Sequence, residues 1–207
     1  MRFEKINSVS IIIPVAESYQ DAIELARSDF YRSRGKNKKG SIINMLFYTF
    51  KEPAFAFMFW HRMSSYKCKS LFYYFSKLMH RHFMFKYGIL IPSSTKIGYG
   101  LSIGHPLSIV VNHTTIIGNN CNLSHCVTIG ANERNAAVIG DNVYIGPHVA
   151  IVEDRIIHSN STIGAGTIVV NDIPENATVV GNPLRVVSFN NPGRYINNRW
   201  PKISFSL

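Results

Sequence analysis

Histidine is the residue type in this sequence that best suits acid–base chemistry near neutral pH. Two of the eight histidines, His105 and His125, lie 20 residues apart in the second half of the chain. A neutral imidazole can take a proton from a hydroxyl group, since its unperturbed pKa lies near the operating pH. A lone histidine is more often a packing residue than a catalyst, so the elements that position these two decide the interpretation.

Metal and redox chemistry have less support in the sequence. The three cysteines, Cys68, Cys121 and Cys126, form no CxxC pair, so we expect a reducing compartment with neither a metal site nor a disulfide. The longest uninterrupted apolar run, residues 54–60, is too short to span a bilayer. The N-terminal residues include Glu4 and lack a small-residue cleavage site, which argues against a signal peptide. We therefore expect a cytoplasmic protein.

A repeat of six residues dominates the second half of the chain. Seven of its aliphatic positions are followed at once by glycine. Neither a helix nor an amphipathic strand has a period of six, whereas short strands stacked in a parallel β-solenoid do. The pattern predicts inward-facing side chains at Ile91, Ile97, Ile103 and Ile109, then Val111, Ile117, Leu123 and Ile129, then Ile139, Ile145, Ile151, Ile157, Ile163 and Val169.

The repeat has one interruption and clear limits. The step from Ile129 to Ile139 is ten residues rather than six, which predicts a loop over residues 131–137. The repeat fades after Val170. We expect an N-terminal helical region over residues 1–88, the solenoid domain over 89–187 and a tail over 188–207.

The charge is concentrated before the solenoid. Residues 31–90 hold twelve Lys and Arg but a single acid, Glu52, and residues 41–90 hold 15 of the 25 aromatic residues. We expect helices over residues 16–33, 41–50 and 54–86, with a break near Pro53. Two interpretations remain open: a helical cap with solvated lysines, or peripheral contact with an anionic membrane at the inner face of the cell membrane. No nucleic-acid motif is present, so we expect no nucleic-acid partner.

The second half resembles the hexapeptide-repeat acyltransferases, and within them the serine acetyltransferase-like branch. The resemblance covers about residues 88–188, and the N-terminal region is similar to the helices of members linked to surface polysaccharides. It implies a left-handed parallel β-helix, a homotrimer, and acetyl-CoA bound between subunits. The motifs that carry it are KIGYGLSIGHP at residues 96–106, NCNLSHCVTIG at 120–130, VIGDNVYIG at 138–146 and VVGNPLRVV at 179–187.

The resemblance also implies roles for particular residues. His105 takes the place of the general base, and His125 falls near the same corner one coil later, where it would contact the acceptor or the base. Arg185 would meet the CoA phosphates. Small residues at the solenoid corners would contact the rest of acetyl-CoA, although corner geometry alone also accounts for them. These are Ala131, Gly146, Pro147, Gly164 and Ala165.

The acceptor is predicted from departures from the family. Serine acetyltransferases have an aspartate where this chain has Leu90, an acidic residue where it has Gly104, and an Arg-His pair where it has Asn135-Ala136. Arg134 lies next to that pair, so Arg134 and Asn135 are candidate substrate contacts. Without paired charges to hold an amino acid, we expect a saccharide hydroxyl acceptor in surface polysaccharide biosynthesis. The alternatives are a serine O-acetyltransferase of cysteine biosynthesis and a non-catalytic solenoid, and His105 argues against the latter.

Overall fold

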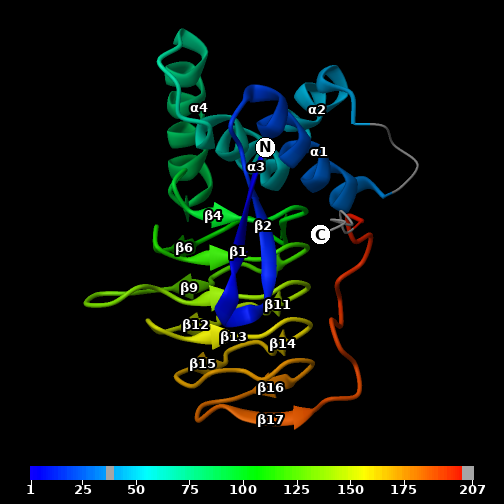
Figure 1. Cartoon of the computed structure of the whole chain (residues 1–207), viewed down its shortest axis with the longest axis vertical. Coiled ribbons are helices and arrows are strands. Elements are labelled where there is room, and N and C mark those ends of the chain that lie inside the picture. Colours follow the sequence, from blue (N-terminus) through cyan, green and yellow to red (C-terminus); the bar gives the residue numbers. More distant parts are fainter. Residues whose placement is uncertain (36–39, 202–207) are drawn as a thin grey trace.

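The computed structural model describes residues 1–35 and 40–201. In this part of the chain, helices lie at one end and a parallel β-solenoid extends away from them, ending at β17 (Figure 1). The predicted fold class, a left-handed parallel β-helix preceded by helices, is confirmed. The fourteen aliphatic positions of the repeat all face the interior and are at most 6% exposed.

Three sheets form the walls of the solenoid. The first sheet contains β4 (Lys96–Ile97), β7 (Ile116–Ile117), β10 (Val138–Ile139) and β13 (Ile156–Ile157). The second contains β5 (Ser102–Ile103), β8 (Asn122–Leu123), β11 (Tyr144–Ile145), β14 (Thr162–Ile163), β16 (Thr178–Val180) and β17 (Arg185–Ser188). The third contains β3 (Ile89–Leu90), β6 (Ile109–Val111), β9 (Thr128–Ile129), β12 (Ala150–Ile151) and β15 (Ile168–Val169).

Three corners join the sheets. The first corner, residues 98–101, 118–121, 140–143 and 158–161, connects the first sheet to the second. The histidine corner, residues 104–108, 124–127, 146–149 and 164–167, connects the second sheet to the third. The loop corner, residues 112–115, 130–137 and 152–155, connects the third sheet back to the first and includes the predicted loop, whose residues 132–135 are exposed. The loop prediction is confirmed.

Coil stacking requires glycine at the first corner. A Cβ atom on Gly118 would lie 2.4 Å from the carbonyl oxygen of Gly140, and one on Gly140 would lie 2.6 Å from the backbone nitrogen of Ser159. Neither contact is sterically allowed, so any larger residue would push successive coils apart. The glycine that follows each aliphatic residue therefore has a packing role here.

The N-terminal region is not helical throughout. Residues 1–15 form an antiparallel hairpin of β1 (Arg2–Ile6) and β2 (Ile11–Val15), joined by the 3₁₀ turn η1 (Asn7–Val9). The hairpin lies along the outside of the first sheet (Figure 1). Its apolar residues Val9, Ile11 and Ile13 pack on outward-facing Ile116, Val138 and Ile156. Tertiary burial against the solenoid therefore explains this strand structure.

The helices broadly follow the prediction. They are α1 (Tyr19–Arg34), α2 (Ile42–Thr49), α3 (Pro53–Ser65) and α4 (Leu71–Tyr87). The single helix expected over residues 54–86 is wrong, because a non-helical segment separates α3 from α4. There the side chain of Ser70 accepts a hydrogen bond from the backbone N–H of Tyr73 at 3.1 Å and caps α4. No described helix has the length and apolar composition that crossing a bilayer requires.

The tail packs on the second sheet. After β17 it runs back beside the solenoid toward α1 (Figure 1). The ring of Tyr195 lies 5.0 Å from that of Tyr144, and the side chain of Asn122 donates a hydrogen bond to the carbonyl of Tyr195. The first and second sheets are thus each covered by a terminal segment of the same chain.

Candidate functional site

Three histidines form a column along the histidine corner. His105 follows β5, His125 follows β8 and His148 follows β11, in three successive coils. The ring centroids of His105 and His125 are 5.7 Å apart, and those of His125 and His148 are 5.4 Å apart, both in edge-to-face arrangement. The parallel stacking of coils places these side chains together although they are 20 and 23 residues apart in sequence.

The environment of the column suits acid–base chemistry. His105 and His148 are exposed, and both have left-handed backbone conformations, with φ of 54° and 58°. Asn120, Asn142 and Asn160 of the first corner share this conformation, so it belongs to corner geometry and fixes where the two rings lie. His125 is half-buried, and its buried Nδ1 atom has no hydrogen-bond partner among the described residues. An acceptor hydroxyl could therefore reach His105 from solvent, with His125 beside it.

His148 was not anticipated from the sequence. A coil is 18 residues long, as the pairing of Val138 with Ile156 shows, and the loop adds four residues. Counting 22 residues from His125 reaches Pro147, the immediate neighbour of His148. That spacing is the signal that could have identified it.

Several candidate acetyl-CoA contacts lie on the same corner. Gly146 and Pro147 occupy it in the coil of His148, and Gly164 and Ala165 occupy it in the next coil. Arg185 is the first residue of β17 and pairs with Val180, the last residue of β16. The strands of the second sheet run toward the histidine corner, so Arg185 lies on that side of the solenoid. The structure therefore aligns these five positions with His105 and His125 along one edge of the solenoid.

Packing alone accounts for the two glycines in this set. A Cβ atom would lie 2.8 Å from the Ile163 carbonyl oxygen if placed on Gly146, and 2.8 Å from Val180 Cγ1 if placed on Gly164. Gly104, directly before His105, differs, because a Cβ there would meet only the Leu123 carbonyl oxygen at 4.0 Å. Open space thus adjoins the candidate base.

The remaining candidates lie elsewhere in the chain. Ala131, Arg134 and Asn135 belong to the loop corner, at the opposite end of the strands of the third sheet. Arg134 is exposed and pairs with Asp154 at 3.2 Å. Within one chain the structure does not bring these three residues to His105.

Glu153 fixes the shape of this loop. One carboxylate oxygen accepts hydrogen bonds from the backbone N–H groups of Asn132, Glu133 and Arg134, at 2.9, 3.0 and 3.1 Å. These bonds hold the pKa of Glu153 below its ordinary value. The loop is therefore held in a defined shape from the next coil and can present Arg134 outward.

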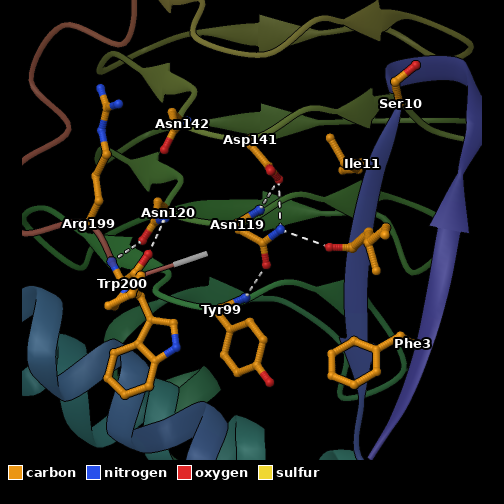
Figure 2. A pocket seen from close by; sticks show the side chains of 12 residues that line it. Phe3, Ser10, Ile11, Tyr99, Asn119, Asn120, Asp141, Asn142, Arg199 and Trp200 are labelled. Carbon is orange, nitrogen blue, oxygen red and sulfur yellow. Dashed lines mark hydrogen bonds between the residues drawn. The ribbon is translucent and has the colours of Figure 1, made fainter. Parts of the chain in front are cut away.

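A separate pocket of about 430 Å³ lies at the first corner, between the hairpin and the tail (Figure 2). Its polar side chains serve structural hydrogen bonds. Asn119 donates to the carbonyl of Ile12 and to Asp141, and Asn120 accepts from the backbone N–H of Trp200 at 2.7 Å (Figure 2). The described residues that line it include no histidine or cysteine. This pocket joins the two terminal segments to the solenoid and lies away from the histidine column.

Comparison with known proteins agrees with the architecture. Residues 136–171 match the family model described as bacterial transferase hexapeptide (six repeats). The chain is 38% identical over 96 residues to a mitochondrial serine acetyltransferase of Arabidopsis thaliana, covering 44% of this chain and 25% of that protein. It is 32% identical over 131 residues to serine acetyltransferase of Bacillus subtilis, covering 61% of this chain and 60% of that protein.

Solved structures extend the likeness to the helices. A serine acetyltransferase of Neisseria gonorrhoeae in complex with serine is 28% identical, with a TM-score of 0.63, over 81% of this chain and 72% of that one. A serine acetyltransferase in complex with CoA is 25% identical, with a TM-score of 0.67, over 81% of this chain and 70% of that one. The family match and the fold together support the hexapeptide-repeat transferase family. The chain spans only 25% to 43% of the length of the first curated relatives it matches.

The predicted saccharide acceptor is wrong, and the assignment to polysaccharide biosynthesis falls with it. The relatives and structural neighbours are serine acetyltransferases. The uncharged residues Leu90, Gly104 and Asn135 are therefore too weak a basis for excluding serine. Serine acetyl transfer, the alternative, is the better-supported function.

Proposed function

We propose that this protein is an acetyl-CoA-dependent O-acetyltransferase that uses the hydroxyl of serine as acceptor. The observation that carries the proposal is the histidine column, which lies on the same edge of the solenoid as the candidate acetyl-CoA contacts. The serine acetyltransferases among its relatives and structural neighbours support the choice of serine.

His105 acts as the general base in this proposal. Its neutral imidazole takes the hydroxyl proton of serine as the oxygen attacks the thioester carbonyl of acetyl-CoA. The C–S bond then breaks, the acetyl group remains on the serine oxygen, and the proton leaves with the CoA thiol. A thioester is already a reactive acyl donor, so holding donor and acceptor together supplies much of the remaining acceleration. His125 lies beside His105 and orients its ring or the acceptor.

The proposed assembly is a homotrimer. Support comes from the third sheet, whose outward-facing Leu90 and Val110 are each 40% exposed, whereas terminal segments cover the other two sheets. The histidine corner and the loop corner border this face on opposite sides. A neighbouring subunit packed here would bring its loop, with Arg134, toward the histidine column. Arg134 could then bind the serine carboxylate.

Thiol release from acetyl-CoA tests the proposal. The purified protein should release CoA thiol in proportion to added serine, and mass spectrometry should detect O-acetylserine. The His105→Ala variant should lose this activity, while His82→Ala, which changes an exposed histidine of α4, should retain it. Acetyl-CoA binding without serine-dependent thiol release would overturn serine as acceptor. Failure to bind acetyl-CoA would favour the non-catalytic solenoid.

A further inference from the structure

Helix α4 has two apolar faces, and only one of them is buried. The inner face packs on α3 and contributes Met79, Phe83 and Met84 to the core. The outer face carries five large side chains, each at least 49% exposed: Leu71, Tyr74, Phe75, Leu78 and Phe85. Their spacing places them within about 100° around the helix axis, so they form one continuous stripe. A contiguous exposed apolar stripe of this kind marks an interaction surface.

Basic residues border the stripe. Lys77, Arg81 and Lys86 lie on α4, with Lys67 and Lys69 just before it, and all five are exposed. Among the described residues none of the five forms an ion pair, and the sequence contains no acidic residue between Glu52 and Glu133. The guanidinium of Arg81 lies 5.0 Å from the ring centroid of Phe85. The surface thus combines apolar side chains with uncompensated positive charge.

Helix α2 repeats the pattern at the same end of the molecule. Ile43 and Phe47 of α2 and Phe50, which caps its C-terminal end, are 63%, 67% and 89% exposed, and exposed Lys51 follows. Both helices lie at the end opposite β17 (Figure 1). The packing of the helical region thus leaves an apolar stripe exposed on each of these two helices.

We propose that the outer face of α4, assisted by α2, docks on a membrane surface rich in anionic phospholipids. An amphipathic helix with aromatic and aliphatic residues on one side and Lys and Arg beside them lies in the headgroup region in this way. Charge decides between lipid and a second copy. Two copies joined symmetrically through this stripe would place their cations together without an acidic residue to pair with them, whereas anionic headgroups neutralise them.

Vesicle co-sedimentation of the intact chain tests the docking. Wild type should sediment with vesicles of phosphatidylglycerol and phosphatidylcholine at low salt, should be released as salt rises, and should stay in the supernatant with phosphatidylcholine alone. Leu78→Ser with Phe85→Ser removes part of the stripe, and Lys77→Gln with Arg81→Gln removes part of the charge. Each pair should weaken binding by about tenfold or more. The matched control is Val186→Ser with Phe189→Ser, exposed apolar residues at the far end of the solenoid, which should bind as wild type does.

Circular dichroism should check that each variant is folded. The Lys77→Gln and Arg81→Gln variant changes only exposed charges and leaves the apolar packing intact. Wild type that stays in the supernatant with anionic vesicles at low salt overturns the proposal. If, in addition, the stripe variant has a smaller oligomeric mass than wild type, a second copy of the chain covers the stripe instead of lipid. Serine acetylation in solution should be unchanged in all these variants, so this test is independent of the proposed activity.

Discussion

At the scale of single residues, His105 has the role with the sharpest expected effect. It is exposed, and the contact of its side chain that the described residues show is the edge-to-face one with His125, so His105→Ala should leave the thermal unfolding temperature within error of wild type. Turnover should fall by about 100- to 10,000-fold, the usual contribution of a positioned general base. Thiol release at saturating acetyl-CoA measures this. Turnover within a few-fold of wild type would remove His105 from the mechanism.

His125 and His148 should separate in their kinetic effects. His125 neighbours the base, so His125→Ala should lower kcat by about tenfold to a hundredfold through misplacement of His105 or of the acceptor. His148 shares a turn with Gly146 and Pro147, so His148→Ala should mainly raise the KM for acetyl-CoA. Initial rates against each substrate distinguish the two. Equal effects of both variants on both parameters would mean that the column acts only as a structural unit.

At the scale of elements, the contact between α3 and α4 should be sensitive to acid. Burial lowers the pKa of His80 to about 4. Burial, together with the nearby His80 and Arg62, also holds the pKa of His61 well below its ordinary value. The two ring centroids lie 5.3 Å apart. The positive charge of Lys77 also lowers the pKa of His80. Both imidazoles are therefore neutral in the folded protein at pH 7, whereas in the unfolded chain they gain protons below about pH 6.5.

The sign of the effect follows from this difference. The unfolded chain binds more protons between about pH 6.5 and 4, so stability is fully present above pH 6.5 and is lost as the pH falls through the folded pKa. For His80, whose pKa falls to about 4, the loss amounts to about 3 kcal/mol. His80→Leu should therefore show a smaller drop in unfolding temperature between pH 7 and pH 4.5 than wild type. Parallel pH profiles would exclude His80 as a source of the sensitivity.

A buried ion pair joins the helices to the solenoid. Asp29 of α1 accepts hydrogen bonds from Arg62 of α3 at 2.8 and 3.0 Å and from the backbone N–H of Leu101 at 2.8 Å. Arg62 also donates to the carbonyls of Ile97 and Gly98. Arg62→Met would leave a buried carboxylate without its cation and should cost about 3–5 kcal/mol in the free energy of unfolding. Arg27→Met, which breaks the exposed pair with Glu24, should cost about 1 kcal/mol or less. Denaturant titration compares them.

These elements differ in how far the sequence alone could predict them. The inward positions from Ile91 to Val169 were predictable, since each coil repeats them and the ten-residue step locates the loop. The last coil was not, because the repeat fades after Val170 although Ile173 and Val179 are buried and pair with the coil before them. The hairpin over residues 1–15 was not, because its strands are stabilised by Ile116, Val138 and Ile156 of distant coils. The pair of Asp29 and Arg62 likewise has no local signal. His105 and His125 could be placed on one corner from spacing, but the separation of Arg134 and Asn135 from them required the order of the sheets.

At the scale of the whole molecule, the uncovered third sheet predicts how copies assemble. Its outward column of Leu90, Val110, Thr128, Ala150 and Ile168 lacks charged residues. If the proposed trimer forms through this face, Val110→Asp should place a carboxylate in the interface and convert trimer to monomer, with loss of activity. The control is Val186→Asp, which changes a side chain of equal exposure, 41% against 40%, on β17. Light scattering coupled to size-exclusion chromatography gives the mass of each. A wild-type monomer, or a Val110→Asp trimer, would contradict this interface.

Mixing two inactive variants tests whether the site is shared between subunits. If Arg134 of one subunit serves His105 of its neighbour, His105→Ala and Arg134→Ala should each be impaired alone. In mixed trimers, some clefts combine an intact His105 with an intact Arg134 from the adjacent chain. Co-refolded mixtures should therefore regain part of the wild-type rate, whereas mixtures of either variant with itself should not. If both residues act within one chain, activity cannot recover, because every chain in the mixture carries one defect. Confirmed mixed trimers without recovered activity would therefore place the acceptor site within a single subunit.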